Sequence, residues 1–178
     1  MKTKILRKTI KYKGKSIQVL NQVNIVSEDL SELVFEYVHR QNVALIIPIL
    51  ENKEIIIVRQ YRAAVDRVVL EFPAGKQKEG ESIEETALRE LEEETGYSAS
   101  NIFLIGEFFT SPHFSNERVF VYIAKGLNAC SKQSFSDHEF INQFTMPFSK
   151  LEQAFDKEVI KDAKSIISLN YYKSFING

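Results

Sequence analysis

Apolar and polar residues alternate along residues 1–40, and this alternation predicts three β-strands at Ile5–Tyr12, Ser16–Ile25 and Leu33–His39. Lys13-Gly14-Lys15 is typical of a hairpin turn between the first two strands. Three short strands bury little surface by themselves and leave their edges exposed. We therefore expect residues 1–40 to form an N-terminal β-strand extension that serves as a dimerisation element.

Residues 41–178 mix strand and helix patterns. Val43–Leu50 is a continuous apolar run, as expected of a strand buried on both faces, and the turn Glu51-Asn52-Lys53 predicts a hairpin with Glu54–Gln60. Further strands are expected at Val68–Phe72, Ile102–Thr110, Arg118–Ala124 and Phe140–Met146, and helices at Ile83–Thr95, Ser149–Phe155 and Lys161–Phe175. Mixed strands with helices on either side predict an α/β fold, specifically an α/β/α sandwich with a mixed β-sheet.

The helix expected at Ile83–Thr95 has a signal at each end. Ser82 followed by Glu85 is a capping-box pattern, and Gly96 suits the left-handed conformation that ends many helices. At 100° per residue, an apolar stripe runs along this helix and should pack on a sheet, formed by Ile83, Ala87 and Leu91.

Three carboxylates on this helix conflict with that packing. Glu94 falls inside the apolar stripe, Glu90 lies at its edge, and Glu93 lies one step further round. Like charges this close repel, and burying one is costly. A divalent cation such as Mg²⁺ or Mn²⁺ removes the conflict because both prefer oxygen ligands. Arg89 can orient the carboxylates, although the cluster alone fits an acidic surface helix equally well.

The spacing around this cluster decides between the two interpretations. Gly75, Glu81, Arg89-Glu90-Leu91, Glu93-Glu94 and Gly96-Tyr97 follow the pattern Gx5Ex7REUxEExGU, where U is a bulky apolar residue. Every fixed identity of the Nudix box is present, and only Tyr97 stands where an aliphatic residue is more usual. The chain therefore resembles the Nudix hydrolase family, and we expect residues 41–178 to be a Nudix hydrolase domain.

The resemblance implies a metal-dependent reaction at the box. Nudix enzymes cleave the diphosphate of a nucleoside diphosphate linked to another group, with Mg²⁺, or alternatively Mn²⁺, as cofactor. The implied metal ligands are the carboxylates of Glu90, Glu93 and Glu94 and the carbonyl of Ala74. The resemblance also implies that Arg89 and Glu81 position the cluster. We count Arg89 and Glu93 among the catalytic residues.

A general base is also implied, on a loop downstream of the box. In relatives of this kind it is an acidic residue, and the corresponding region here is Ser136–Glu139. We favour Glu139, with Asp137 as the alternative, while His138 stands where relatives usually carry another carboxylate. A plain surface loop is the competing interpretation, in which case a box glutamate acts as the base.

Three further stretches resemble ADP-ribose and related sugar-nucleotide pyrophosphatases. The first is residues 58–62 followed by residues 70–75, and the others are residues 111–118 and 161–166. Pro112 lies fifteen residues after Tyr97, a spacing typical of that group. The resemblance implies hydrolysis of ADP-ribose to AMP and ribose 5-phosphate. GDP-mannose or another nucleoside diphosphate sugar is the alternative substrate. A binding module that senses ADP-ribose without cleaving it fits less well because the box is intact. A triphosphatase fits less well because of the N-terminal extension and the spacing of Pro112.

The candidate substrate-binding residues are Arg62, Glu117, Pro112 and Phe114. Arg62 can bind a phosphate bidentately or form a structural ion pair. Glu71 can orient a metal or simply end a strand in water. Glu117 can bind a ribose hydroxyl, or pair with Arg118 or another neighbour. Phe114 can stack on adenine, although a place in the core is the commoner role of an aromatic residue.

Composition narrows the functional classes. A net charge of −1 provides no general attraction for nucleic acid or an anionic membrane, and a single cysteine, Cys130, excludes an internal disulfide. The first fifteen residues lack the apolar segment of a signal peptide, and Val43–Leu50 is too short to span a bilayer. We therefore expect a cytoplasmic protein with a small-molecule substrate. The resemblance implies a homodimer in which the N-terminal strands reach the partner subunit.

Overall fold

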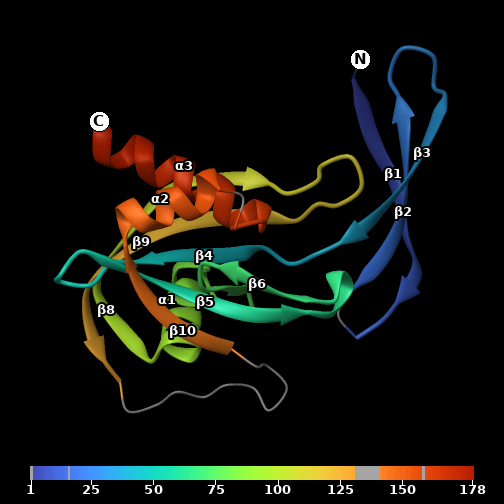
Figure 1. Ribbon diagram of the computed structural model, residues 1–178. Helices are drawn as coiled ribbons and strands as arrows, with labels where there is room; N and C mark the ends of the chain where they lie inside the picture. Colours follow the sequence, from blue (N-terminus) through green and yellow to red (C-terminus); the bar gives the residue numbers. More distant parts are fainter. Residues whose placement is uncertain (1, 16, 131–140, 158) are drawn as a thin grey trace. The chain divides into compact units, whose positions relative to one another are not determined.

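The computed structural model describes residues 2–15, 17–130, 141–157 and 159–178 (Figure 1). The chain divides into two compact units. The first contains Met1–Gln41 and Phe109–Arg118, and the second contains Asn42–Phe108 and Val119–Gly178. Phe109–Arg118 therefore belongs to the same unit as the N-terminal strands, from which it is remote in sequence.

The first unit is built on a three-stranded antiparallel sheet of β1 (Thr3–Lys13), β2 (Gln18–Val26) and β3 (Glu32–His39), in the order β1-β2-β3. The three strands expected from the alternating pattern are confirmed. Phe109–Arg118 joins this unit through backbone contacts: the Val38 N–H donates to the Phe114 carbonyl at 2.7 Å, and Val38 forms a parallel bridge with Ser115.

Within the described residues, the second unit contains two sheets and three α-helices. An antiparallel sheet has the strand order β10-β5-β6, and a mixed sheet has the order β7-β4-β9-β8. The strands of this unit are β4 (Val43–Pro48), β5 (Glu54–Arg62), β6 (Arg67–Glu71), β7 (Ala74–Lys76), β8 (Tyr97–Phe109), β9 (Arg118–Ala129) and β10 (Ile141–Pro147). The helices are η1 (Ala63–Val65, 3-10), α1 (Ile83–Thr95), α2 (Phe148–Asp156) and α3 (Ala163–Asn177).

The sequence predicted a hairpin of β4 and β5. The turn is present, but the prediction that the two strands pair along their length is wrong. A single bridge joins Ile49 to Ile55, and the two strands then enter different sheets. The reason is that β4 is buried on both faces. Its side chains Leu45 and Ile47 share a core with β5, so β5 stacks face to face with β4 instead of extending its sheet.

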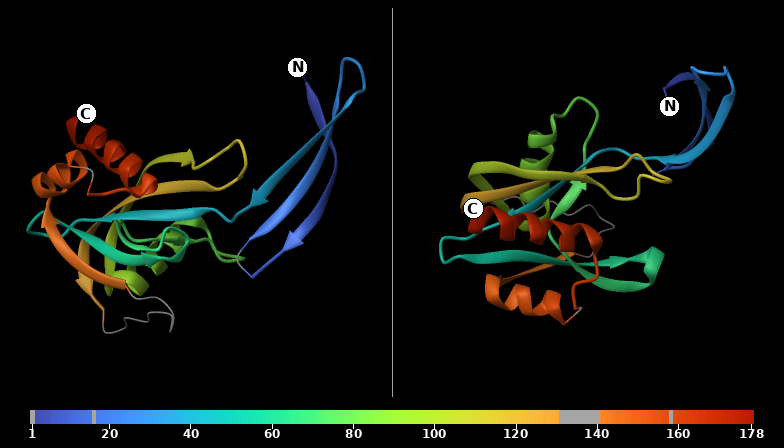
Figure 2. Two further views of the ribbon diagram at one scale, coloured as in Figure 1. Left: turned by 45° about the vertical axis from the view of Figure 1, so that its right-hand side comes forward. Right: turned by 90° about the horizontal axis from the view of Figure 1, so that it is seen from above.

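Helices cover both sides of the mixed sheet, which confirms the α/β/α arrangement (Figure 2). On one face, Ala44 and Ile46 of β4 pack against Ala87 and Leu91 of α1. The core on the other face includes residues of the antiparallel sheet, α2 and α3. Among the helices in the described parts of the chain, none is long and apolar enough to cross a membrane.

Two strands of the mixed sheet differ from the expected pattern. The sequence Ala74-Gly75-Lys76 has no strand periodicity, yet it forms β7 by pairing antiparallel with β4, with Ala44 opposite Gly75. β8 begins at Tyr97, immediately after the cap of α1, and not at Ile102. β7 and the first residues of β8 become strands because they pair with neighbouring strands. Neither segment has the alternating apolar pattern that would identify a strand from sequence alone.

Candidate active site

The helix α1 has the ends that its sequence predicts. The Glu85 N–H donates to Ser82 Oγ at 3.1 Å and the Ser82 N–H donates to Glu85 Oε2 at 2.7 Å, which completes the capping box. Gly96 adopts a left-handed φ of 70°, and its N–H donates to the Glu92 carbonyl. These local contacts stop the helix at defined residues, and the packing of Leu91 and Ala87 fixes its rotation.

That rotation buries two of the three clustered carboxylates on α1. Glu94 is 7% exposed and Glu90 is 9% exposed, whereas Glu93 is partly exposed. The predicted placement of Glu94 within the apolar stripe and of Glu90 at its edge is confirmed. A buried carboxylate is costly unless it is hydrogen-bonded or paired with a cation, so each must have a compensating partner.

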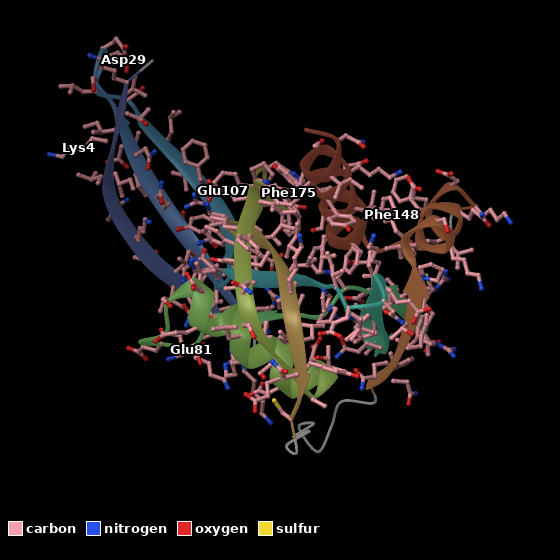
Figure 3. All side chains as sticks on the ribbon, turned by 90° about the vertical axis from the view of Figure 1, so that its left-hand side faces the viewer. Lys4, Asp29, Glu81, Glu107, Phe148 and Phe175 are labelled. Atoms are coloured by element: carbon pink, nitrogen blue, oxygen red, sulfur yellow. The ribbon has the colours of Figure 1, made fainter. Side chains whose placement is uncertain are left out.

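Arg89 is the common partner of three carboxylates. Its Nη1 donates to Glu90 Oε1 at 2.6 Å and to Glu93 Oε2 at 2.9 Å. Its Nε donates to Glu81 Oε1 at 2.7 Å, and its Nη2 donates to the Lys76 carbonyl. Glu81 lies on the loop before α1 (Figure 3). One guanidinium thus holds α1 to the loop before it and to β7.

These contacts change the acidities of the groups involved. Burial raises the pKa of Glu90, and the neighbouring Arg89 opposes that rise without cancelling it. The hydrogen bond from Arg89 is the main reason that the pKa of Glu81 falls from its ordinary value of 4.5 to about 2. Desolvation lowers the pKa of Arg89, but its bonds to Glu81 and Glu90 outweigh this and raise it overall.

The backbone of β7 closes around the carboxylates. The Ala74 N–H donates to Glu94 Oε2 at 3.1 Å. A Cβ at Gly75 would lie 1.8 Å from the carboxyl carbon of Glu90, so only glycine leaves room for this carboxylate beside the strand. β7 is therefore both a strand of the mixed sheet and one wall of the carboxylate site.

This donor set fits a divalent metal ion. Two buried carboxylates, a third beside them and a strand backbone free of side-chain atoms at Gly75 provide the oxygen ligands that Mg²⁺ prefers. In the described parts of the chain, no three acidic, histidine or cysteine side chains already converge on one point. Glu90 and Glu93 instead point to Arg89, so a metal must compete with this guanidinium for them.

A second charged cluster lies where β6 meets α3. Arg62 donates to both carboxylate oxygens of Glu71, at 2.7 and 2.6 Å, and Glu71 is 3% exposed. Lys164 lies between Glu71 and Asp162, and Asp162 caps α3 by accepting from the Ser165 N–H. Arg62 therefore forms the structural ion pair that the sequence left as an alternative, and the suggestion that Glu71 ends a strand in water is wrong.

The residues that sequence reasoning assigned to the 111–118 stretch lie in the first unit. Glu117 accepts from Arg40 Nε at 3.1 Å, and both line a cavity of about 310 Å³. Phe114 also lines this cavity and is 46% exposed, so a place for it in the core is wrong. Pro112 is exposed. Arg118 lies over the ring of Phe109 at 6.0 Å.

Sequence reasoning missed Arg40, Lys164 and Ser165 as members of these clusters. Arg40 is 77 residues from Glu117, and Ser165, whose Oγ accepts from the Phe72 N–H, is 93 residues from its partner. Nothing local in the sequence marks these pairs. The candidate bases Glu139 and Asp137 lie outside the described residues, so their assignment stays a prediction.

Comparison with known proteins identifies the family. Residues 39–167 match the family model of the NUDIX domain. The match covers well over half of the chain, so this protein belongs to the NUDIX-domain family, and the assignment made from the box is confirmed. Members of this family generally need a divalent metal ion, in agreement with the carboxylate site on α1.

Individual relatives share the same region. The ADP-ribose pyrophosphatase of Bacillus subtilis (strain 168) is 34% identical over 137 residues, which are 76% of this chain and 74% of the relative. The methanol dehydrogenase activator of Bacillus methanolicus is 35% identical over the same shares. A crystal structure of an ADP compounds hydrolase superposes with a TM-score of 0.84 at 22% identity, covering 100% of this chain and 96% of that one. That last similarity shows the fold.

Proposed function

We propose that this protein hydrolyses the diphosphate of ADP-ribose to AMP and ribose 5-phosphate, with Mg²⁺ as the metal and Mn²⁺ as the alternative. The observation that carries the proposal is the carboxylate site of α1, in which Glu90 is held against the backbone at Gly75. The similarity to an ADP-ribose pyrophosphatase over three quarters of both chains supports the choice of substrate.

Glu90, Glu93, Glu94 and the Ala74 carbonyl would hold the metal. When bound, it would neutralise the diphosphate and lower the pKa of a coordinated water. Arg89 positions Glu90 and Glu93 through the bonds described above. Water adds to one phosphorus while the bond from that phosphorus to the bridging oxygen breaks, and Glu139, or alternatively Asp137, accepts the proton of the water.

Arg62, Pro112, Phe114 and Glu117 are the proposed substrate-binding residues. Phe114 is exposed at a cavity that also holds the ion pair of Arg40 and Glu117, which provides an aromatic face beside polar groups. Such a cavity is suited to a nucleoside, which has a flat base and sugar hydroxyls. Arg62 is held by Glu71 in a fixed orientation, and this rigidity favours binding of a phosphate.

We also propose that the protein is a homodimer joined through its N-terminal sheet. Val34 and Phe35 are neighbours on β3 and therefore point to opposite faces, yet they are 60% and 46% exposed. On β1, Ile5, Leu6, Ile10 and Tyr12 are all about half exposed or more. Large apolar side chains on a small sheet favour burial against another surface, and a second copy supplies one. Light scattering across a dilution series tests this.

The experiment that tests the activity measures product release from a panel of nucleoside diphosphate compounds, with Mg²⁺ and with a chelator. We expect metal-dependent cleavage that is fastest with ADP-ribose. Faster cleavage of GDP-mannose or another compound would keep the reaction and replace the substrate. Tight binding of ADP-ribose without any cleavage would overturn the enzymatic proposal in favour of a binding module.

A further inference from the structure

A second cavity, of about 620 Å³, lies on the second unit beside the cluster of Arg62 and Glu71. Its walls come from the β5–β6 connection and from the start of α3. The charged residues lining it are Arg62, Arg67, Glu71, Lys161, Asp162 and Lys164. Four cations thus face two carboxylates in one pocket, and the remaining lining residues are small or aliphatic.

The two carboxylates already have partners. Glu71 is bound bidentately by Arg62, and Asp162 by Lys164. The excess positive charge therefore belongs to Arg67 and Lys161. Both are exposed, and among the described residues no carboxylate lies within ion-pair distance of either. Arg67 is held in place by its Nε, which donates to the Val65 carbonyl at 3.3 Å.

This pocket is close to the carboxylate site. Glu71 lines the pocket, and Ala74 of the carboxylate site follows it by three residues. Three residues of extended chain span at most about 11 Å, so the Cα atoms of Glu71 and Ala74 are no further apart than that. The hydrogen bond from Arg62 to Glu71 is the main cause that raises the pKa of Arg62, and the negative charge of Glu94 contributes to the same rise. One extended small molecule can therefore reach both places.

We propose that the pocket formed by Arg67 and Lys161 binds a third phosphoryl group of the substrate, beyond the diphosphate that is cleaved. The preferred substrates are then ADP-ribose compounds that carry a phosphate on one of their two riboses. A guanidinium and an ammonium match a dianionic phosphate in charge, and the guanidinium can bind it bidentately. Val65 and Val69 provide an apolar wall for the sugar that carries it. This inference rests on the proposed function.

The test compares three compounds: ADP-ribose, ADP-ribose phosphorylated on the adenosine ribose, and ADP-ribose phosphorylated on the distal ribose. The measured quantity is the ratio of kcat/KM for each phosphorylated compound to that for ADP-ribose. We expect this ratio to exceed one for at least one of the two phosphorylated compounds. The double variant R67Q/K161Q should lower that ratio by about tenfold or more, because it removes two charge-assisted contacts.

A control variant removes a positive charge from another part of the surface. Lys150 is exposed on α2, and K150Q should leave the ratio at its wild-type value. Which ribose carries the favoured phosphate identifies the end of the substrate that enters the pocket. A wild-type ratio of one or less that the double variant does not change would overturn the proposal. Inhibition by inorganic phosphate that the double variant relieves, without any substrate preference, would assign the pocket to a free anion and also overturn it.

Failure of the proposed function gives a different result. If the wild-type protein cleaves none of the three compounds, calorimetric binding of each is measured with a chelator present. Tighter binding of a phosphorylated compound, lost in R67Q/K161Q and kept in K150Q, would still support the pocket assignment. Equal binding of all three compounds would reject it.

Discussion

Replacing Gly75 by alanine tests whether the carboxylate of Glu90 must lie against β7. A Cβ at this position would lie 1.8 Å from the carboxyl carbon of Glu90 and 1.9 and 2.2 Å from its oxygens. Gly75 is not among the residues with positive φ, so alanine fits the backbone and the conflict is with the side chain alone. The variant therefore displaces Glu90 selectively.

The size of the displacement follows from these distances. Ordinary contact begins at 3.4 Å, so the carboxyl carbon must retreat from 1.8 to 3.4 Å, about 1.6 Å if it moves directly away. Metal–ligand distances tolerate changes of only about 0.2 Å. A misplacement of about 1 Å in a catalytic site can lower the rate about 100-fold. We expect kcat/KM for ADP-ribose to fall about 100-fold in G75A.

The assay is a titration of turnover with Mg²⁺, together with thermal unfolding in the presence and absence of the metal. The Mg²⁺ concentration for half-maximal rate should rise at least about tenfold in G75A. Metal bound to the native state raises the Tm, and this increase should shrink in the variant. Overpacking by itself costs about 1–3 kcal/mol, which lowers the Tm of a chain of this size by about 2–12 °C.

Gly106 provides the matched control. A Cβ there would lie 2.3 Å from the ring of Tyr171, in the contact between β8 and α3. G106A should lose stability to a similar degree, while its dependence on Mg²⁺ stays that of the wild type. The reasoning is refuted if G75A keeps normal turnover and normal Mg²⁺ dependence, or if both variants lose metal affinity equally.

Three further predictions concern single carboxylates. Glu94→Gln keeps the volume of the side chain and removes one ligand charge, so turnover should fall more than about 100-fold with little change in Tm; near-normal activity would remove this residue from the metal site. Glu139→Gln should lower kcat by about 10²–10⁴-fold if it is the general base, and unchanged turnover would move that role to Asp137 or to the box. Glu81→Gln should lower the Tm because it breaks the ion pair with Arg89. The pKa of Glu81 is depressed in the folded state, so its stabilisation is present above pH 4.5 and is lost as the pH falls toward about 2. The Tm difference between wild type and this variant should narrow over that range, and a constant difference would contradict the assignment.

The helix that carries the box was predictable to the residue. Ser82, Glu85 and Gly96 act on backbone groups within one turn of themselves, and the apolar stripe through Leu91 repeats at the helical period. Contacts between residues three or four apart are set by local geometry alone. The burial of Glu94 follows from the same periodicity, so the location of the carboxylate site was also visible in the sequence.

The partners of the remaining charged residues were not predictable in this way. From the sequence, Arg62 could bind a phosphate or form an ion pair. The pairing of β5 with β6 places Glu71 opposite Val58, and only the side-chain contact in the folded structure shows that Glu71 is the partner of Arg62. Arg40 had no assigned role, although it forms the ion pair of Glu117. An ion pair forms wherever two opposite charges come close in the folded chain. The local sequence around either residue does not indicate which distant segment will supply its partner.

The sequence by itself determined the family, the bounds of α1, the three N-terminal strands and the carboxylate cluster, because each depends on periodicity or on contacts over a few residues. Only the tertiary structure decided that β4 and β5 stack in separate sheets, that β7 forms beside Glu90, and that cations gather where β6 meets α3. A continuous apolar run indicates that a strand is buried on both faces. It does not indicate whether the next strand joins the same sheet or the facing sheet, because that depends on how the whole core packs.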